Sequence, residues 1–226
     1  MMEENLQIEK LTLMERVKFF FIKPGKVFEQ YIIKPTFGLK LLIICIALAL
    51  TGYAMSTQSN VLLQQMIDNY KKINPNVTQS AIDTIMNYYK VVTGAPFLIF
   101  SALIGAIITI FLVSLVYWII SKIFKSEASY KDTVAVYTLA YMPMAIANVL
   151  LSIFTLCTNS SFLISSSLQG NLVNKILVSF NPFTIWQIVL LVIGLAKVGN
   201  ISKKNSAIIV GLLTLIHILY FVFTMK

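Results

Sequence analysis

Residues 96–120 read PFLIFSALIGAIITIFLVSLVYWII, a run of 25 residues without a charged side chain. An α-helix rises about 1.5 Å per residue, so about 20 apolar residues cross the hydrocarbon core of a bilayer, which is roughly 30 Å thick. This run therefore predicts a helix that spans a membrane.

Four further apolar runs of similar length lie at residues 38–57, 133–156, 180–198 and 206–225. Backbone groups inside a bilayer must bond within their own segment, and these runs lack the ten-residue alternation of barrel strands. The chain is 58% hydrophobic and 12% charged, against about 25% charged residues in soluble domains. The sequence thus predicts an all-α integral membrane protein: a bundle of five transmembrane helices with N-terminal interfacial amphipathic helices.

One membrane domain of five helices is expected at residues 38–226, preceded by a cytoplasmic N-terminal interfacial segment at residues 1–37. Between the first two spans, residues 58–95 carry two amphipathic stripes separated by Asn74-Pro75-Asn76, which predicts an extracytoplasmic helical hairpin. Pro143 should kink the third span near residues 139–141. Ser101, Gly105 and Thr109 recur every four residues and predict a face for close helix packing.

The net charge of +9 is unevenly distributed along the chain. Of the lysines and arginines, 13 fall before or at the start of the first span or beside the loops after the second and fourth, and 5 fall on the opposite side. The positive-inside rule then places the N-terminus in the cytoplasm and the C-terminus outside the cell membrane. Basic membrane edges explain the charge without nucleic acid, and no aromatic-basic RNA motif is present.

The N-terminal segment combines apolar side chains at helical spacing with basic ones, a pattern typical of a helix lying on an anionic leaflet. We interpret it as a docking segment for the membrane surface or for a partner. An ordinary topology-setting flank remains the alternative. The residues assigned to docking are Arg16, Lys18, Lys23, Lys26, Phe20 and Phe21.

The sequence contains no recognisable catalytic motif. No Asp, Glu, Lys or Arg lies near the middle of a span, and His217 is the single histidine. Cys45 and Cys157 have no CxxC spacing, and GxSxG, HExxH and GxxxxGK[ST] motifs are absent. We therefore expect no enzyme, no cofactor and no metal site. The expected partners are the lipid bilayer and another membrane protein.

The run Asn181-Pro182-Phe183-Thr184-Ile185-Trp186, followed by Gly194, resembles the closing signature of the Yip (Ypt-interacting protein) domain family. Pro24 to Phe28 resembles that family's entry segment, and the stretch up to Pro143 resembles its third span. The resemblance covers roughly residues 15–225. It implies five spans with a cytoplasmic N-terminus.

Eukaryotic members of that family act in vesicle traffic through Rab-type GTPases, whereas bacterial members are mostly of unknown role. This sequence lacks the acidic DLYGP-type segment of the trafficking branch. Its composition, rich in Lys, Asn and Ile, resembles the bacterial branch, which implies the plasma membrane of a bacterium.

Three hypotheses of function follow. The first is a non-enzymatic protein that binds other membrane proteins, for instance as an accessory subunit of an export or envelope-stress complex. The second is a channel or transporter for small molecules or lipids. Its polar lining would come from Tyr137, Tyr141, Asn148, Asn181 and Gln187. The third is a trafficking factor that binds a small GTPase.

Overall fold

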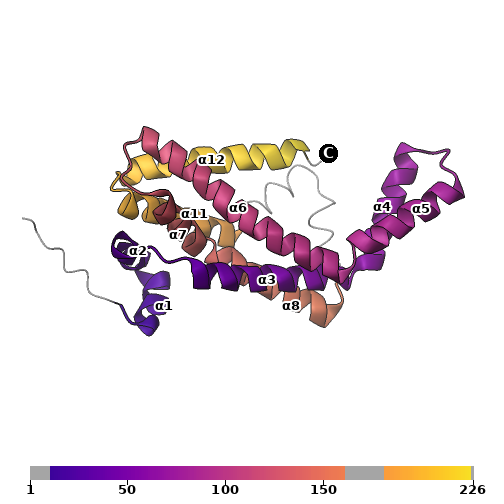
Figure 1. Ribbon diagram of the computed structural model, residues 1–226, viewed down its shortest axis with the longest axis horizontal. Coiled ribbons are helices and arrows are strands. Elements are labelled where there is room, and N and C mark those ends of the chain that lie inside the picture. Colours follow the sequence, from indigo (N-terminus) through magenta and orange to yellow (C-terminus); the bar gives the residue numbers. More distant parts are fainter. Residues whose placement is uncertain (1–10, 161–180, 225–226) are drawn as a thin grey trace, which may run out of the picture. The chain divides into compact units, whose positions relative to one another are not determined.

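The computed structural model describes residues 11–160 and 181–224 (Figure 1). These residues form helices and no strands, which confirms the predicted all-α class. The helices are α1 (Leu13–Ile22), α2 (Pro24–Ile33), α3 (Gly38–Ser56), α4 (Ser59–Ile73), α5 (Gln79–Val92), α6 (Ala95–Ile123), α7 (Tyr130–Ala140), α8 (Met142–Thr158), α11 (Pro182–Val198) and α12 (Lys203–Thr224).

Three helical stretches among these residues are long and apolar enough to cross a membrane: α3, α6, and α7 continued by α8. They contain or closely match the predicted spans at residues 38–57, 96–120 and 133–156. α11 is apolar but has 17 residues, and residue 180 of its predicted span lies outside the described part. The predicted last span falls within α12 up to Thr224, and its final residue is likewise outside. The total of five spans stays a prediction.

The third predicted span is divided into two helices at the place where Pro143 is expected to kink it. α7 ends at Ala140, Tyr141 forms a turn, and α8 begins at Met142. The proline ring has no N–H with which to bond the carbonyl one turn earlier, so the regular bonding of the helix is broken there. At its other end, α7 begins with a capping box in which Ser129 and Asp132 bond each other's backbone N–H groups.

The predicted packing face of Ser101, Gly105 and Thr109 was wrong, because all three residues are exposed. A Cβ built on Gly105 would meet nothing within 4 Å. α6 turns another row inward, and this row is also partly made of small residues. Its buried members are Ala106, Ile110, Ser114, Tyr117 and Ser121.

Contacts divide the chain into two compact units. Unit 1 comprises Met1–Leu41, Thr109–Pro143 and Pro182–Tyr220, and unit 2 comprises Leu42–Ile108, Met144–Asn181 and Phe221–Lys226. In unit 1, α11 packs against α7 and α2, and residues 133–140 of α7 are all buried. The core of unit 1 therefore lies where α2, α7 and α11 meet.

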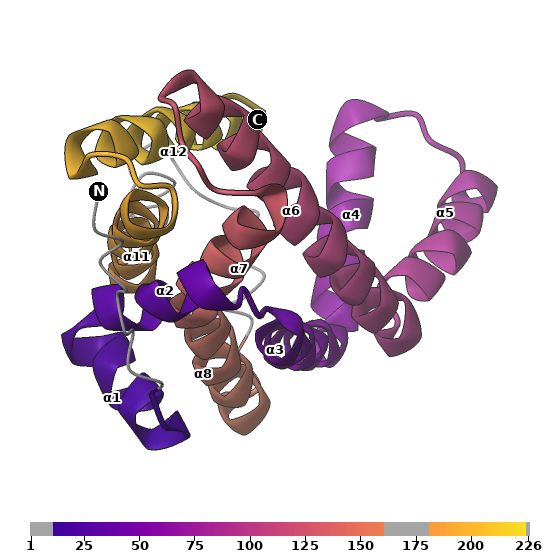
Figure 2. The same cartoon turned by 60° about the vertical axis from the view of Figure 1, so that its left-hand side comes forward.

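Unit 2 contains the helical hairpin expected between the first two spans. α4 and α5 pack against each other, with Leu62, Ile67 and Ile82 buried, and Figure 2 shows the loop that joins them. Elsewhere in this unit, the Ser152 hydroxyl donates a hydrogen bond to Thr51 Oγ1. The two helices are confirmed, whereas their extracytoplasmic position stays a prediction.

Candidate functional site

The second N-terminal helix, α2, is seated on α7 and α11. Val27, Phe28 and Tyr31 are buried, and Phe28 is fully so. Its ring lies against Gly194 of α11, where an added Cβ would fall 2.7 Å from Phe28 Cε1 and 2.6 Å from Val136 Cγ1. Two positions of the family motif, Phe28 and Gly194, are thus in direct contact.

An ion pair lies beside the contact between α2 and α11. Lys197 Nζ, in the last turn of α11, lies 2.7 Å from Glu29 Oε1 of α2. Both side chains are partly solvated, so the pair contributes on the order of 0–1 kcal/mol to stability. The pair therefore adds little to the free energy that holds α2 against α11. The packing of Phe28 carries most of the attachment.

The first helix, α1, is attached through aromatic side chains. The rings of Phe20 and Phe21 lie 5.2 Å and 5.1 Å from the ring of Trp186, centre to centre. Phe20 is buried there, whereas Phe21 keeps more than half of its surface exposed. Two residues assigned to docking therefore meet the family-motif tryptophan. The remaining motif prolines lie at helix starts, with Pro24 first in α2, Pro182 first in α11 and Pro143 second in α8.

Asn181 lies directly before α11, and Phe183 is its second residue. Both fall at the point where the chain passes from unit 2 to unit 1.

The four basic residues assigned to docking are all exposed. Arg16 Nε donates a hydrogen bond to the Leu11 carbonyl, and Lys26 Nζ lies 5.1 Å from the centre of the Phe19 ring. Lys18 and Lys23 are the other two. These cations are presented to the surroundings of α1 and α2, not to the core of unit 1.

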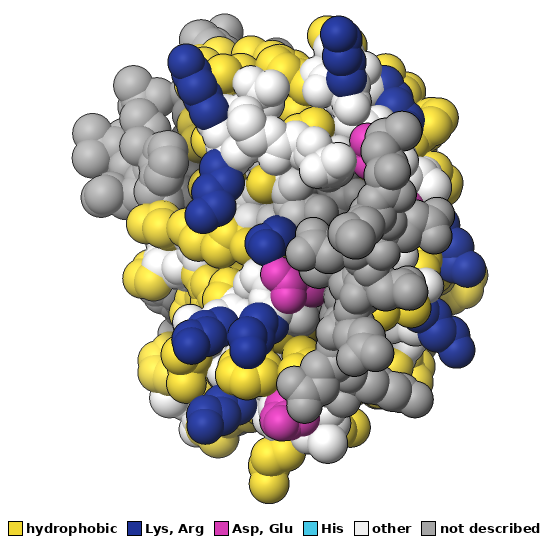
Figure 3. All heavy atoms as spheres, turned by 90° about the vertical axis from the view of Figure 1, so that its left-hand side faces the viewer, with side chains coloured by type: hydrophobic (Ala, Val, Ile, Leu, Met, Phe, Trp, Pro, Cys, Tyr) yellow, Lys and Arg dark blue, Asp and Glu magenta, His cyan; other side chains and the backbone are white. Residues whose placement is uncertain are grey.

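Positive charge is concentrated in unit 1. Its described residues include twelve lysines and arginines against four acidic residues, compared with three against two in unit 2. Figure 3 shows Lys and Arg side chains spread over one face of the molecule, with few Asp or Glu between them. Five exposed lysines of unit 1 lie in or beside the two loops that follow α6 and α11. We call the exposed lysines of unit 1 at these loops, Lys122, Lys125, Lys131, Lys203 and Lys204, the basic loop cluster.

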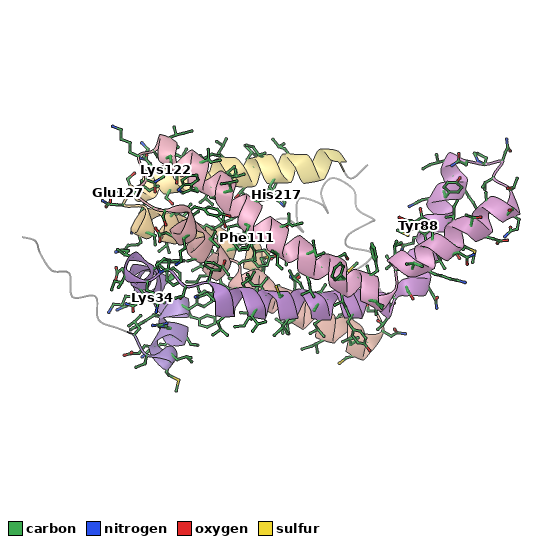
Figure 4. All side chains as sticks on the ribbon, viewed as in Figure 1. Lys34, Tyr88, Phe111, Lys122, Glu127 and His217 are labelled. Atoms are coloured by element: carbon green, nitrogen blue, oxygen red, sulfur yellow. The ribbon has the colours of Figure 1, made fainter. Side chains whose placement is uncertain are left out.

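Hydrogen bonds hold these two loops together. The Glu127 backbone N–H donates to the Gly199 carbonyl, and Asn200 Nδ2 donates to Glu127 Oε2 at 3.2 Å. Asn200 adopts a left-handed φ of 51°, a conformation that asparagine tolerates better than most residues. Figure 4 labels Lys122 and Glu127 in this region. The basic loop cluster therefore rests on a defined scaffold.

Lys40 and Tyr31 form a further contact in unit 1. Lys40 Nζ lies 4.9 Å from the centre of the Tyr31 ring and donates a hydrogen bond of 2.6 Å to the Thr36 carbonyl. The Tyr31 hydroxyl is buried without a partner among the described residues, and burial raises the pKa of Tyr31. The hydroxyl therefore stays protonated and neutral beside the cation.

The polar residues proposed to line a channel are brought together only in part. The rings of Tyr117, Tyr137 and Tyr141 follow one another at 5.9 Å and 6.2 Å. Asn148 and Asn181 belong to unit 2. The tyrosines are packed against one another, which is an arrangement that joins helices.

The side chains of His, Cys, Asp and Glu are those that could hold a metal ion. Among the described residues, no group of three His, Cys, Asp or Glu side chains is placed to hold a metal ion. His217 is exposed on α12 and is labelled in Figure 4. The predicted absence of enzymatic activity stays a prediction.

Sequence reasoning missed Glu29 and Val136. Glu29 carries no signal in the sequence, because nothing in its neighbourhood along the chain indicates a contact with Lys197. Val136 looked like any other apolar residue of a span. Both gain their roles from helices far apart in the sequence.

Comparison with known proteins adds two findings. The model of the Yip1 domain matches residues 18–225. The "Membrane protein YknW" of Bacillus subtilis (strain 168) is 25% identical over 229 residues, which covers 94% of this chain and 93% of that protein. No solved structure matches the chain significantly.

Proposed function

This chain belongs to the Yip1 domain family, and from that premise we propose that it is a non-enzymatic membrane protein that acts by binding another membrane protein. The observation that supports the proposal is the basic loop cluster of unit 1. Its lysines are exposed, and the two loops beside them are bonded to each other. A preformed surface that is mainly basic favours a partner with an acidic surface.

The proposed partner is a membrane protein with an acidic surface at the same side of the bilayer. Complementary charge raises the rate of encounter and excludes partners with basic surfaces. An accessory subunit of an export or envelope-stress complex would use such a surface. The described residues of unit 1 include twelve basic residues against four acidic ones, so the surface proposed to bind the partner is positively charged.

We further propose that the protein lies in a bacterial plasma membrane, with the N-terminus and the basic loop cluster in the cytoplasm and the C-terminus outside. The positive-inside rule supports this orientation. Single cysteines in a background without Cys45 and Cys157 test it. A membrane-impermeant maleimide should label Asn76→Cys on intact cells, and Ser202→Cys only after lysis. Labelling in the reverse order would contradict the orientation.

Binding is tested by purification from native membranes in mild detergent. The wild type should recover a second membrane protein in fixed stoichiometry. Replacing Lys131, Lys203 and Lys204 by glutamine should remove that protein, because these exposed lysines supply the complementary charge. The matched control replaces Lys71, Lys72 and Lys90 of α4 and α5 by glutamine, which changes the charge equally in unit 2.

Two results would count against the proposal. One is recovery of the protein alone under several gentle conditions. The other is equal retention of the second protein by the basic-cluster variant and its control, which would move the contact away from these loops.

A further inference from the structure

Helix α1 exposes an apolar face although it is attached to the rest of unit 1. Leu13, Met14, Val17 and Phe21 each keep more than half of their side-chain surface exposed. A helix turns about 100° per residue, so Leu13, Val17 and Phe21 form one row and Met14 lies beside it. We call these four residues the outer face of α1.

The attachment of α1 keeps this face turned outward. Phe20 is buried against Trp186, at a ring distance of 5.2 Å. The backbone N–H of Leu11 also donates a hydrogen bond of 3.4 Å to Gln30 Oε1 of α2. Since α1 is held by Phe20, its outer face cannot turn toward the core of unit 1 without losing that contact.

Basic side chains border the outer face. Exposed Lys18 lies beside Met14 on one flank, whereas Arg16 lies on the other flank beyond Phe20. Lys23, also exposed, directly follows the last residue of the helix. The one acidic residue in the helix, Glu15, is engaged in its capping box with Thr12. An apolar face bordered by cations is the pattern of a helix that lies in the interface of an anionic membrane.

The surroundings of α1 match that position. Exposed apolar residues continue along the chain from the end of α2 into the first turn of α3, which is long and apolar enough to span a bilayer. They are Ile32, Ile33 and Leu39.

We propose that the outer face of α1 inserts into an anionic leaflet of the membrane that holds the protein, with lipid phosphodiester groups paired to Lys18 and Lys23. The occupant is a phosphatidylglycerol-type lipid surface. This inference goes beyond partner binding, because it makes the position of α1 depend on the charge of the surrounding lipid. It uses α1, whereas the proposed partner surface uses the basic loop cluster.

The test uses the full chain in nanodiscs, with Cys45 and Cys157 replaced by alanine and a nitroxide attached at Met14→Cys. One set of nanodiscs contains phosphatidylglycerol mixed with phosphatidylcholine, and the other phosphatidylcholine alone. Accessibility of the nitroxide to oxygen and to a water-soluble nickel reagent reports whether it lies in lipid or in water.

In the anionic nanodiscs, we expect the nitroxide to be shielded from the nickel reagent and accessible to oxygen. In the neutral nanodiscs, we expect it to become accessible to the nickel reagent. Each basic side chain near an anionic leaflet changes the docking equilibrium about fivefold. The variant with Lys18→Gln and Lys23→Gln should therefore lower the equilibrium constant about 25-fold in anionic nanodiscs. The matched control with Lys71→Gln and Lys72→Gln, on α4, should behave as the wild type.

Three outcomes would overturn the proposal. High nickel accessibility in both lipids would show that the face stays in water. Shielding in both lipids without an effect of the lysine changes would show that lipid charge is not sensed. Spin–spin coupling between two copies in one nanodisc, with shielding in either lipid, would assign the face to a second copy of the chain. The lipid comparison on the unmutated lysines keeps the test valid even if the double variant is unstable.

Discussion

The ring of Phe28 lies so close to Gly194 that no side chain fits between them, since a Cβ on Gly194 would fall 2.7 Å from Phe28 Cε1. Through this contact α2, which precedes the first long apolar helix, is joined to α11 near the other end of the chain. The N-terminal helices are therefore built into unit 1.

Gly194→Ala should lower the stability of unit 1. The new methyl group would displace Phe28 and Val136, and overpacking of this kind typically costs about 1–3 kcal/mol. Thermal unfolding in detergent would measure the loss, and hydrogen exchange should show α2 losing protection. The control is Gly211→Ala on α12, where nothing lies within 4 Å. Equal effects of the two changes would contradict the close contact.

Gly52→Ala should destabilise unit 2 more strongly than Gly194→Ala destabilises unit 1. The added Cβ would lie 2.8 Å from the Leu98 carbonyl oxygen and 3.1 Å from Ile99 Cα, which are backbone atoms of α6. A backbone relaxes less easily than a side chain, so we expect a cost at or above about 3 kcal/mol. Gly105→Ala, on the exposed side of α6, is the matched control and should be tolerated. Similar unfolding temperatures for both variants would refute the prediction.

Trp186→Ala should release α1 while α2 stays in place. The indole contacts Phe20 and Phe21, whereas α2 is held by Phe28 and by the pair of Glu29 with Lys197. Hydrogen exchange should then rise in residues 13–22 and remain low in residues 24–33. Ile185→Ala, at an exposed neighbouring position, serves as the control. Loss of protection in both helices together would show that they dock as one element.

The first turn of α1 should depend on pH through Glu15. Its Oε2 accepts hydrogen bonds of 2.8 Å from both the backbone N–H and the hydroxyl of Thr12. The backbone bond first, and then the hydroxyl bond, hold the pKa of Glu15 below its ordinary value of 4.5. A carboxyl with a lowered folded-state pKa stabilises the fold above its unfolded pKa and loses that effect as the pH falls through the lowered value.

We therefore expect the amides of the first turn to lose protection as the pH drops below 4.5, once intrinsic exchange rates are taken into account. Glu15→Gln should remove this dependence, since an amide oxygen still accepts the bonds but does not titrate. The same pH response in both proteins would assign it to another group.

Much of the fold follows from local pattern. The long uncharged runs predict helices because the backbone has no other partner in lipid. Pro143 predicts a kink near residues 139–141 because a proline lacks an N–H, and the division between α7 and α8 falls there. The two stripes between residues 58 and 95 predict α4 and α5 by their spacing. In each case the cause lies within one or two helical turns of the residue concerned.

Contacts between helices were not predictable in the same way. The row of Ser101, Gly105 and Thr109 has the spacing of a packing face, but α6 packs with the row that includes Ala106 and Ile110. A transmembrane helix is apolar on all sides, so composition does not distinguish the side that meets protein from the side that meets lipid.

The sequence alone determined that this protein is helical, belongs in a membrane and carries a basic N-terminal helix, since hydropathy, length and charge are properties of consecutive residues. Only the tertiary structure decided that Phe28 packs on Gly194, that Glu29 pairs with Lys197 and that α1 turns Phe20 inward and Leu13, Val17 and Phe21 outward. The reason is that these contacts join residues more than 150 positions apart, or depend on which side of a helix another helix covers, and no local pattern encodes either.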